Sequence, residues 1–92
     1  MHNNIYIISY DLKNPGQNYE KLLKRIKAYP LWARLGGSAY LIGTPATASD
    51  IRNYLIQVLD YNDQLFVGSA PAPSAWHGLP EDVSNWIRTN QK

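Results

Sequence analysis

The feature that most constrains the fold is a run of β-forming residues near the start of the chain, "IYIISY" at residues 5–10. Its apolar side chains lie on both parities, with Ile5 on one and Tyr6 and Tyr10 on the other. A strand with one face in water alternates polar and apolar residues, whereas a strand buried on both faces is a continuous apolar run. The sequence therefore predicts a strand in the middle of a sheet, covered on both faces.

Helical periodicity follows this strand twice. Residues 19–29 repeat apolar side chains at helical spacing, and we expect Asn18 to cap the start of this helix and the following proline to end it. Residues 47–59 show the same repeat, and Thr47 and Asp50 have the spacing of a capping box. The two segments predict amphipathic helices, each with one apolar side turned toward a core.

Two further strands lie between the helices. The segment "LWARLGGSAYLIGT" at residues 31–44 predicts a β-hairpin, because Gly36-Gly37 supplies the positive φ that a tight turn requires. After the second helix, "YNDQLFVGS" at residues 61–69 predicts a turn and a short fourth strand. The order β-α-β-β-α-β predicts an α+β, ferredoxin-like fold, in which both helices lie on one face of a four-stranded antiparallel sheet.

The length of 92 residues predicts one domain. Residues 1–70 form its ferredoxin-like part, and residues 71–92 form a C-terminal extension. Pro71 and Pro73 make the extension unsuitable as a central strand, whereas Pro80 begins a short helix that must dock to be stable. The sheet face opposite the two helices then has three candidate covers, which are a second copy of the chain, a nucleic acid, or this extension.

Composition excludes several classes of protein. The chain has no cysteine, so disulfides and thiolate metal sites are excluded. It opens without the charged and apolar regions of a signal peptide, and no apolar run approaches the ~20 residues that a membrane helix needs. We expect a cytoplasmic protein that has no membrane partner.

Basic side chains gather in the first part of the chain. Residues 1–34 hold six basic and two acidic groups, a net charge of +4, whereas residues 35–92 hold three basic and five acidic groups, a net charge of −2. A basic half can follow a phosphate backbone, and Lys13, Lys24 and Arg34 are the candidates for phosphate contact. The alternative is a solvated helix face with ordinary lysines.

Asp11, at the end of the first strand, has two interpretations. As a turn residue it caps the amides of the loop at residues 14–16. As a functional group it stands alone, and one carboxylate is a poor site for Mg²⁺. Two copies of Asp11 across a twofold dimer axis would bracket one hydrated Mg²⁺ or Mn²⁺. Asp11 is therefore the candidate metal ligand and catalytic residue, with Ser9 and Tyr10 as neighbours that shape the site.

The predicted element order is also that of the RNA-recognition motif, which stacks bases on aromatic side chains of its sheet. The run "IYIISY" matches the first-strand motif of that family, and Tyr6 and Tyr40 are the candidate stacking residues. The third strand has Ser38 and Gly43 at places where aromatics are usual. Binding of single-stranded RNA through sheet tyrosines is therefore an alternative function.

The element order and the segment "IISYDL" resemble the small subunit of CRISPR adaptation, which is the ferredoxin-like partner of the CRISPR integrase, and the VapD-type ribonuclease toxins. In that group the first strand ends in an aromatic residue and Asp, here Tyr10-Asp11, and a hairpin Arg precedes a Ser-aromatic segment, here Arg34 and residues 38–41. This likeness covers residues 5–69. The chain also resembles a small SinR-like branch over nearly its whole length, through "YDLKNPGQNYEKL", "DIRNYL", "YNDQLFV" and "AWHGLP".

The resemblance implies a homodimer built on the open sheet faces, with Asp11 near its axis, that is either a metal-dependent nuclease or a structural adaptor. The CRISPR family continues into a fifth strand that pairs with the partner. Here "APAPSAWHGLP" takes that place, and its prolines argue against strand exchange and an integrase-type partner. We expect a dimer that binds RNA or DNA or acts as an adaptor, and we rank a divalent-metal-dependent endonuclease activity at Asp11 slightly below this expectation. A non-catalytic protein-interaction dimer is the alternative.

Overall fold

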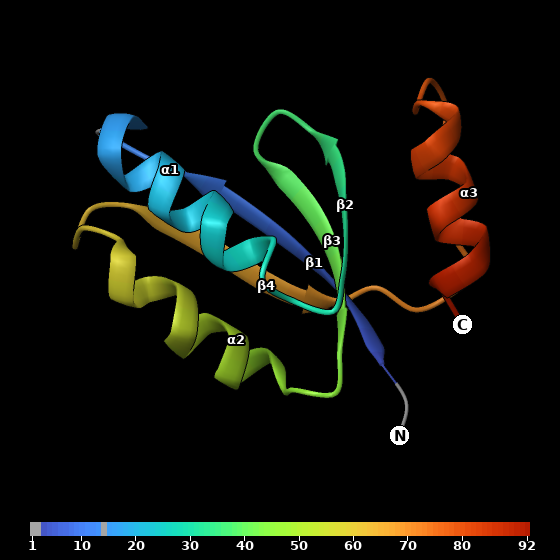
Figure 1. Cartoon of the computed structure of the whole chain (residues 1–92), viewed down its shortest axis with the longest axis horizontal. Coiled ribbons are helices and arrows are strands. Elements are labelled where there is room, and N and C mark those ends of the chain that lie inside the picture. The colour runs from blue at the N-terminus through green and yellow to red at the C-terminus, as the bar shows by residue number, and fades with distance from the viewer. Residues whose placement is uncertain (1–2, 14) are drawn as a thin grey trace.

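Four antiparallel strands form one sheet in the order β2-β3-β1-β4, with helices packed on it (Figure 1). The computed structural model describes residues 3–13 and 15–92. The strands are β1 (Asn4–Asp11), β2 (Leu31–Gly36), β3 (Ala39–Thr44) and β4 (Gln64–Ser69). The helices are α1 (Pro15–Ile26), α2 (Ala48–Leu55) with a 3₁₀ turn η1 (Ile56–Val58) after it, and α3 (Glu81–Asn90). The predicted α+β, ferredoxin-like fold is confirmed.

The first strand lies where its apolar run predicted. β1 pairs with β3 on one side and with β4 on the other, so it occupies the interior of the sheet. Tyr6, Ile8 and Tyr10 are buried in the core between the sheet and α1 and α2. Ile5 is buried in a second cluster on the opposite face. Both faces of the strand therefore carry core residues.

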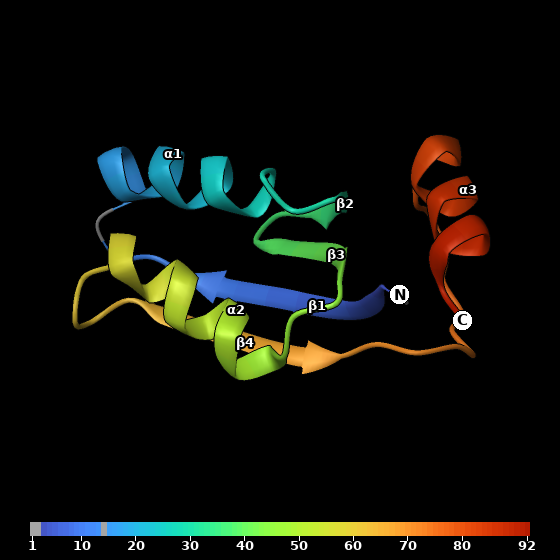
Figure 2. The ribbon, with the colours of Figure 1, turned by 60° about the horizontal axis from the view of Figure 1, so that its bottom comes forward.

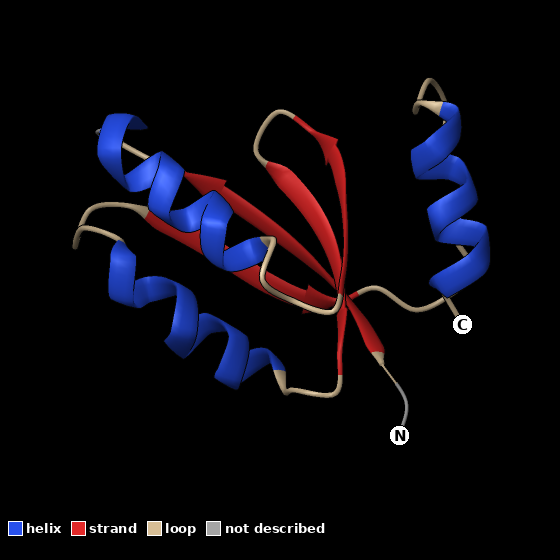
Figure 3. Ribbon diagram, in the orientation of Figure 1, coloured by secondary structure: helices blue, strands red, loops and turns tan. Residues whose placement is uncertain are grey.

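The main core lies between the sheet and the helices α1 and α2, which cover the same face (Figure 3). Its helical residues are those at the predicted helical spacing, namely Leu22, Ile26, Ile51 and Leu55. All four are fully buried, and burial of one such side chain contributes about 1.5–3 kcal/mol. The amphipathic pattern therefore predicted correctly which side of each helix faces the core.

The two helix starts differ from each other in how well the sequence predicted them. Thr47 Oγ1 accepts a hydrogen bond from Asp50 N at 3.1 Å, and Thr47 N donates to Asp50 Oδ2 at 3.2 Å, so the capping box is confirmed. The predicted cap at Asn18 is wrong, because α1 already begins at Pro15. The Asn18 side chain instead donates to Asp63 Oδ2 at 3.3 Å, across to the turn before β4.

The hairpin between β2 and β3 turns at the predicted glycines. Gly36 has a φ of 134° and Gly37 a φ of 42°, both in the region that favours glycine. The register between the strands shifts between Arg34 and Gly36, which marks a bulge next to the turn. The side chains of β2 therefore keep strict alternation only up to this point.

The C-terminal extension packs on the other face of the sheet, away from α1 and α2 (Figure 2). Val83 and Ile87 of α3 are buried against Ile5, Ala33 and Leu41. Of the three candidate covers, the extension covers the part of this face nearest the start of β1. In the described part of the chain, no helix has the length and apolar character needed to cross a membrane.

Side-chain hydrogen bonds fix the extension in place. Trp76 Nε1 donates to Ser84 Oγ at 2.9 Å, which ties the loop to α3. Gln91 Nε2 donates to the Ala70 carbonyl at 2.8 Å and to Ser74 Oγ at 2.7 Å. The docking of this helix, which its short length required, is therefore confirmed.

Candidate functional site

Asp11, the predicted metal ligand, and Arg34, one of the predicted phosphate contacts, lie on opposite faces of the sheet. Side chains that face each other across an antiparallel pair share a face. Arg34 lies opposite Tyr40, which belongs to the main core, whereas Asp11 lies opposite Gln64. Asp11 has the parity of Ile5, which faces α3. Within one chain, Asp11 and Arg34 therefore do not form a single site.

Asp11 is an exposed carboxylate at the end of β1. Its Oδ2 accepts an ion-paired hydrogen bond from Lys13 Nζ at 2.8 Å, and both side chains are exposed. Among the described residues, no group of three or more acidic or histidine side chains could hold a metal ion. Asn14, in the loop that Asp11 was expected to cap, lies outside the described residues.

The sheet face around Asp11 is the part that α3 leaves open. We call Ser9, Asp11, Gln64 and Phe66 the uncovered sheet patch, because Ser9 lies opposite Phe66 and Asp11 opposite Gln64 in the β1–β4 register. The Phe66 side chain is 62% exposed. A Cβ at Gly68 would lie only 2.7 Å from the Phe66 ring, so the absence of a side chain there lets the ring lie along the sheet. The patch therefore combines an exposed aromatic ring with polar groups.

Tyr6 and Tyr40 lie in the main core, so the prediction that they occupy the open face is wrong. Their exposed fractions are 6% and 2%, and Tyr6 Oη donates to the Ala46 carbonyl at 2.7 Å. Both rings lie on the face that α1 and α2 cover. In β1 the even-numbered residues, including Tyr6, face these helices, whereas Ile5 and Ile7 face the opposite side. Neither ring is available to stack on a base in this structure.

A basic and aromatic surface runs along β2 and the adjacent side of α1. The Lys27 ammonium lies 5.1 Å from the centre of the Trp32 ring, a cation–π contact. Trp32 is 39% exposed, and Arg34, two residues further along β2, points to the same face of the sheet and is exposed. Lys24 is exposed on α1, one turn before Lys27. We call Lys24, Lys27, Trp32 and Arg34 the basic strip.

Arg34 lies opposite the buried Tyr40 of the neighbouring strand β3. Burial raises the pKa of Tyr10 and of Tyr40, and the charge of Arg34 lowers both pKa values in part. The Arg34 side chain itself stays exposed. This position places a fixed positive charge at the end of the basic strip nearest the hairpin.

The structure brings some of the predicted residues together and separates others. Lys24 is exposed on α1, which covers the sheet face to which Arg34 points, whereas Lys13 lies in the loop after β1 with Asp11. Lys27 and Trp32 were missing from the prediction. Their signal was the alternation of Trp32 and Arg34 in β2, which puts both on one face once the strand is assigned.

Comparisons with known proteins give the fold and no function. No family model and no curated protein match the sequence. Among solved structures, the chain is similar to the hypothetical protein TT1823 from Thermus thermophilus, with a TM-score of 0.70 and 20% sequence identity. The match covers 84% of this chain and 93% of that one.

Proposed function

We propose that the protein is a homodimer that binds single-stranded RNA or DNA through the basic strip. The observation that carries the proposal is the contact of Lys27 with the half-exposed Trp32, with Arg34 on the same face. An exposed ring flanked by cations matches the chemistry of a nucleic acid strand, in which bases stack on aromatics and phosphates pair with Lys and Arg. Three of the six basic groups in residues 1–34, Lys24, Lys27 and Arg34, belong to this strip.

The proposal is tested by fluorescence anisotropy with short labelled single strands of RNA and DNA. We expect Arg34→Gln and Lys27→Gln each to weaken binding and to reduce the slope of log affinity against log salt by ~0.7. Trp32→Ala is expected to weaken binding by about 5- to 150-fold, the equivalent of ~1–3 kcal/mol of stacking. Arg88→Gln is the matched control, because Arg88 also lies over a tryptophan, Trp76, at 5.6 Å but on α3.

Binding that Arg88→Gln weakens as much as Lys27→Gln does would show that only total charge matters. Binding that does not depend on salt, or no binding at all, would overturn the proposal and favour a non-catalytic protein-interaction dimer. Circular dichroism of each variant separates loss of the surface from loss of the fold.

We propose that the second copy of the chain packs against the uncovered sheet patch. Phe66 gives this patch an apolar centre, and the ion pair of Asp11 and Lys13 gives its rim both charges. A twofold axis through this patch brings the rim against itself, so that the Asp11–Lys13 pairs of the two copies lie close together. Light scattering after gel filtration should give a dimer, and Phe66→Ser should give a monomer with the same circular dichroism. A monomeric parent chain would refute this assignment.

A metal-dependent endonuclease is the second candidate, favoured by the position of Asp11 on this same patch. Two Asp11 carboxylates paired across the axis would hold Mg²⁺ or Mn²⁺, and the ion would supply the polarisation of a phosphoryl oxygen and the activation of a water. Cleavage of labelled strands in Mn²⁺ should then stop with EDTA and with Asp11→Asn. Cleavage that survives Asp11→Asn would place the activity elsewhere.

A further inference from the structure

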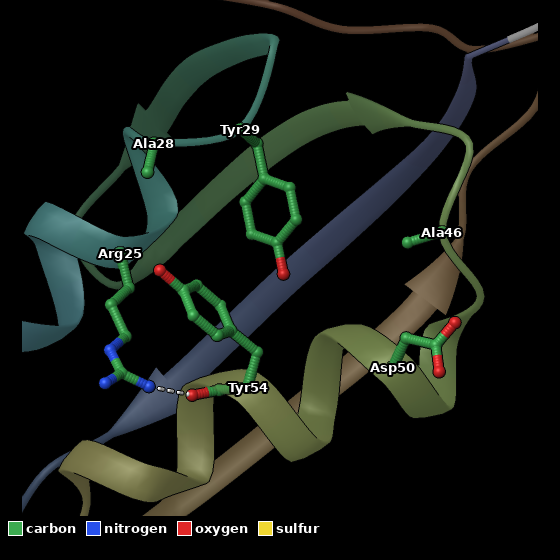
Figure 4. A pocket seen from close by; sticks show the side chains of 6 residues that line it. All are labelled: Arg25, Ala28, Tyr29, Ala46, Asp50 and Tyr54. Atoms are coloured by element: carbon green, nitrogen blue, oxygen red, sulfur yellow. Dashed lines mark hydrogen bonds between the residues drawn. The ribbon is translucent and has the colours of Figure 1, made fainter.

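A cleft of about 320 Å³ opens between α1 and α2, on the side of these helices that faces away from the sheet (Figure 4). Its lining residues come from α1 and the turn after it, from the loop before α2, and from α2 itself: Arg25, Ala28, Tyr29, Ala46, Asp50 and Tyr54. None of these residues belongs to the basic strip or to the uncovered sheet patch. The volume is at the lower end of the ~300–1,000 Å³ that small-molecule sites occupy.

Two aromatic rings form the middle of the cleft. The rings of Tyr29 and Tyr54 meet edge to face, with centres 6.0 Å apart and planes at 86°. Both side chains are partly exposed, and the small side chains of Ala28 and Ala46 leave the space in front of them open. Flat rings are suited to bind another flat ring, because aromatic pairs add about 0.5–1.5 kcal/mol beyond the buried area.

Arg25 is a fixed cation at one end of the cleft. Its Nη1 donates to the Tyr54 carbonyl at 2.6 Å and to Gln57 Oε1 at 2.8 Å, and its guanidinium lies 4.5 Å from the centre of the Tyr54 ring. Both hydrogen bonds use Nη1, so the N–H groups on Nε and Nη2 stay free of them. This edge of a guanidinium forms the fork that binds phosphate through paired hydrogen bonds.

Asp50 is an anion at the other end. Figure 4 shows Arg25 and Asp50 on opposite sides of the two tyrosine rings. Asp50 Oδ2 accepts the hydrogen bond of the capping box from Thr47 N, so Oδ1 keeps its capacity to accept a bond from a ligand. The cleft therefore presents a cation, two rings and an acceptor in sequence.

We propose that this cleft binds a nucleoside 5′-monophosphate with a guanine base. The phosphate pairs with Arg25, the base stacks on one of the two tyrosine rings, and the carboxylate of Asp50 accepts hydrogen bonds from the edge of the base. Guanine presents adjacent N–H donors on N1 and N2, whereas adenine places an acceptor, N1, beside its amino group. A carboxylate accepts bonds only, so it favours guanine and repels that acceptor.

The site is separate from the basic strip, so the two proposals fail independently. We would titrate the full chain with GMP, AMP, guanosine and inorganic phosphate by calorimetry. GMP is expected to bind at least about tenfold more tightly than AMP or guanosine. AMP lacks the paired N–H donors for Asp50 and guanosine lacks the phosphate for Arg25, and hydrogen bonds to charged groups are the strong ones. Asp50→Asn keeps an acceptor for the cap and should abolish the preference for guanine over adenine.

Three further variants complete the design. Arg25→Gln should remove the advantage of GMP over guanosine, while Arg52→Gln, on the side of α2 that faces β4, should leave it unchanged. Arg34→Gln should leave GMP binding unchanged while it weakens strand binding. Equal affinities for GMP and AMP, no binding of GMP, or loss of GMP binding in Arg34→Gln would each overturn the proposal. Circular dichroism verifies that the variants are folded.

Discussion

Removal of the hydroxyl of Tyr10 should stabilise the protein, although most substitutions at buried positions destabilise. Tyr10 is 5% exposed, and its hydroxyl has no hydrogen-bond partner among the described residues. A buried hydroxyl without a partner costs about 1–3 kcal/mol, because it has lost its bonds to water. Tyr10→Phe keeps the ring, its packing and its edge contact with Tyr19, whose ring centre lies 6.1 Å away.

The expected gain is about 1 kcal/mol, at the low end of this range, because the small void left by the oxygen offsets part of it. Tyr6→Phe is the matched comparison, since Tyr6 lies on the same face of the same strand with 6% exposure. Its hydroxyl donates to the Ala46 carbonyl at 2.7 Å. Loss of this bond should cost about 1–2 kcal/mol, so the two substitutions should differ in sign.

Urea unfolding followed by circular dichroism measures both changes, at one fixed protein concentration because the proposed dimer would couple stability to concentration. For a chain of this size, 1 kcal/mol corresponds to a shift of about 4–8 °C in Tm, so a thermal scan provides a second measure. A loss of stability in Tyr10→Phe as large as that in Tyr6→Phe would refute the reasoning. It would mean that the Tyr10 hydroxyl is bonded after all, to Tyr19 or to water.

Three other predictions follow from single contacts. Burial raises the pKa of Tyr10, so the folded state holds this proton more tightly, and stability should fall as the pH rises above the ordinary tyrosine value of 10.0, less steeply in Tyr10→Phe. Hydrogen bonds from two backbone N–H groups lower the pKa of Asp63, so stability should fall as the pH drops below its ordinary value of 3.8, and Asp63→Asn should flatten that fall in acid titrations of the urea midpoint. Gly43→Ala would bring a Cβ to 2.8 Å from Leu31 Cδ1 and 3.2 Å from Ile5 Cδ1, and should cost about 1–3 kcal/mol in the same urea assay.

The fold could be predicted because its local signals agree with one another. The apolar run of β1, the helical spacing in α1 and α2, and the glycines of the hairpin each specify one element, and their order leaves one simple topology. The cap at Asn18 failed because tertiary structure overrides local preference. The side chain of Asn18 donates a hydrogen bond to Asp63, which lies 45 residues further along the chain, and no local sequence pattern predicts that bond.

The candidate sites could be predicted only in part, because the sequence does not say which parity of β1 faces the helices. Both parities are apolar, so Tyr6 could have lain on either face. The pairing register of β1 with its neighbouring strands decides which of its side chains face the helices. This register depends on packing that forms only in the folded chain. The cleft between α1 and α2 was missed for a similar reason, since Arg25 and Asp50 line the same cleft only after both helices have packed on the sheet.

The parity of β1 also explains why an apolar strand ends on a carboxylate. Tyr10 is the last core residue on the face covered by the helices, and Asp11, one residue later, points to the opposite face, where α3 no longer covers the sheet. A charged side chain is tolerated there because it remains in water beside Lys13. Any further role of Asp11 therefore depends on what covers this face.

The basic strip lies on the other side of the sheet and needs no dimer to be complete. Phe66→Ser should thus abolish a dimer-dependent activity at Asp11 and leave the intrinsic affinity of each basic strip for a nucleic acid strand unchanged, which cleavage and anisotropy assays on the same variant would measure.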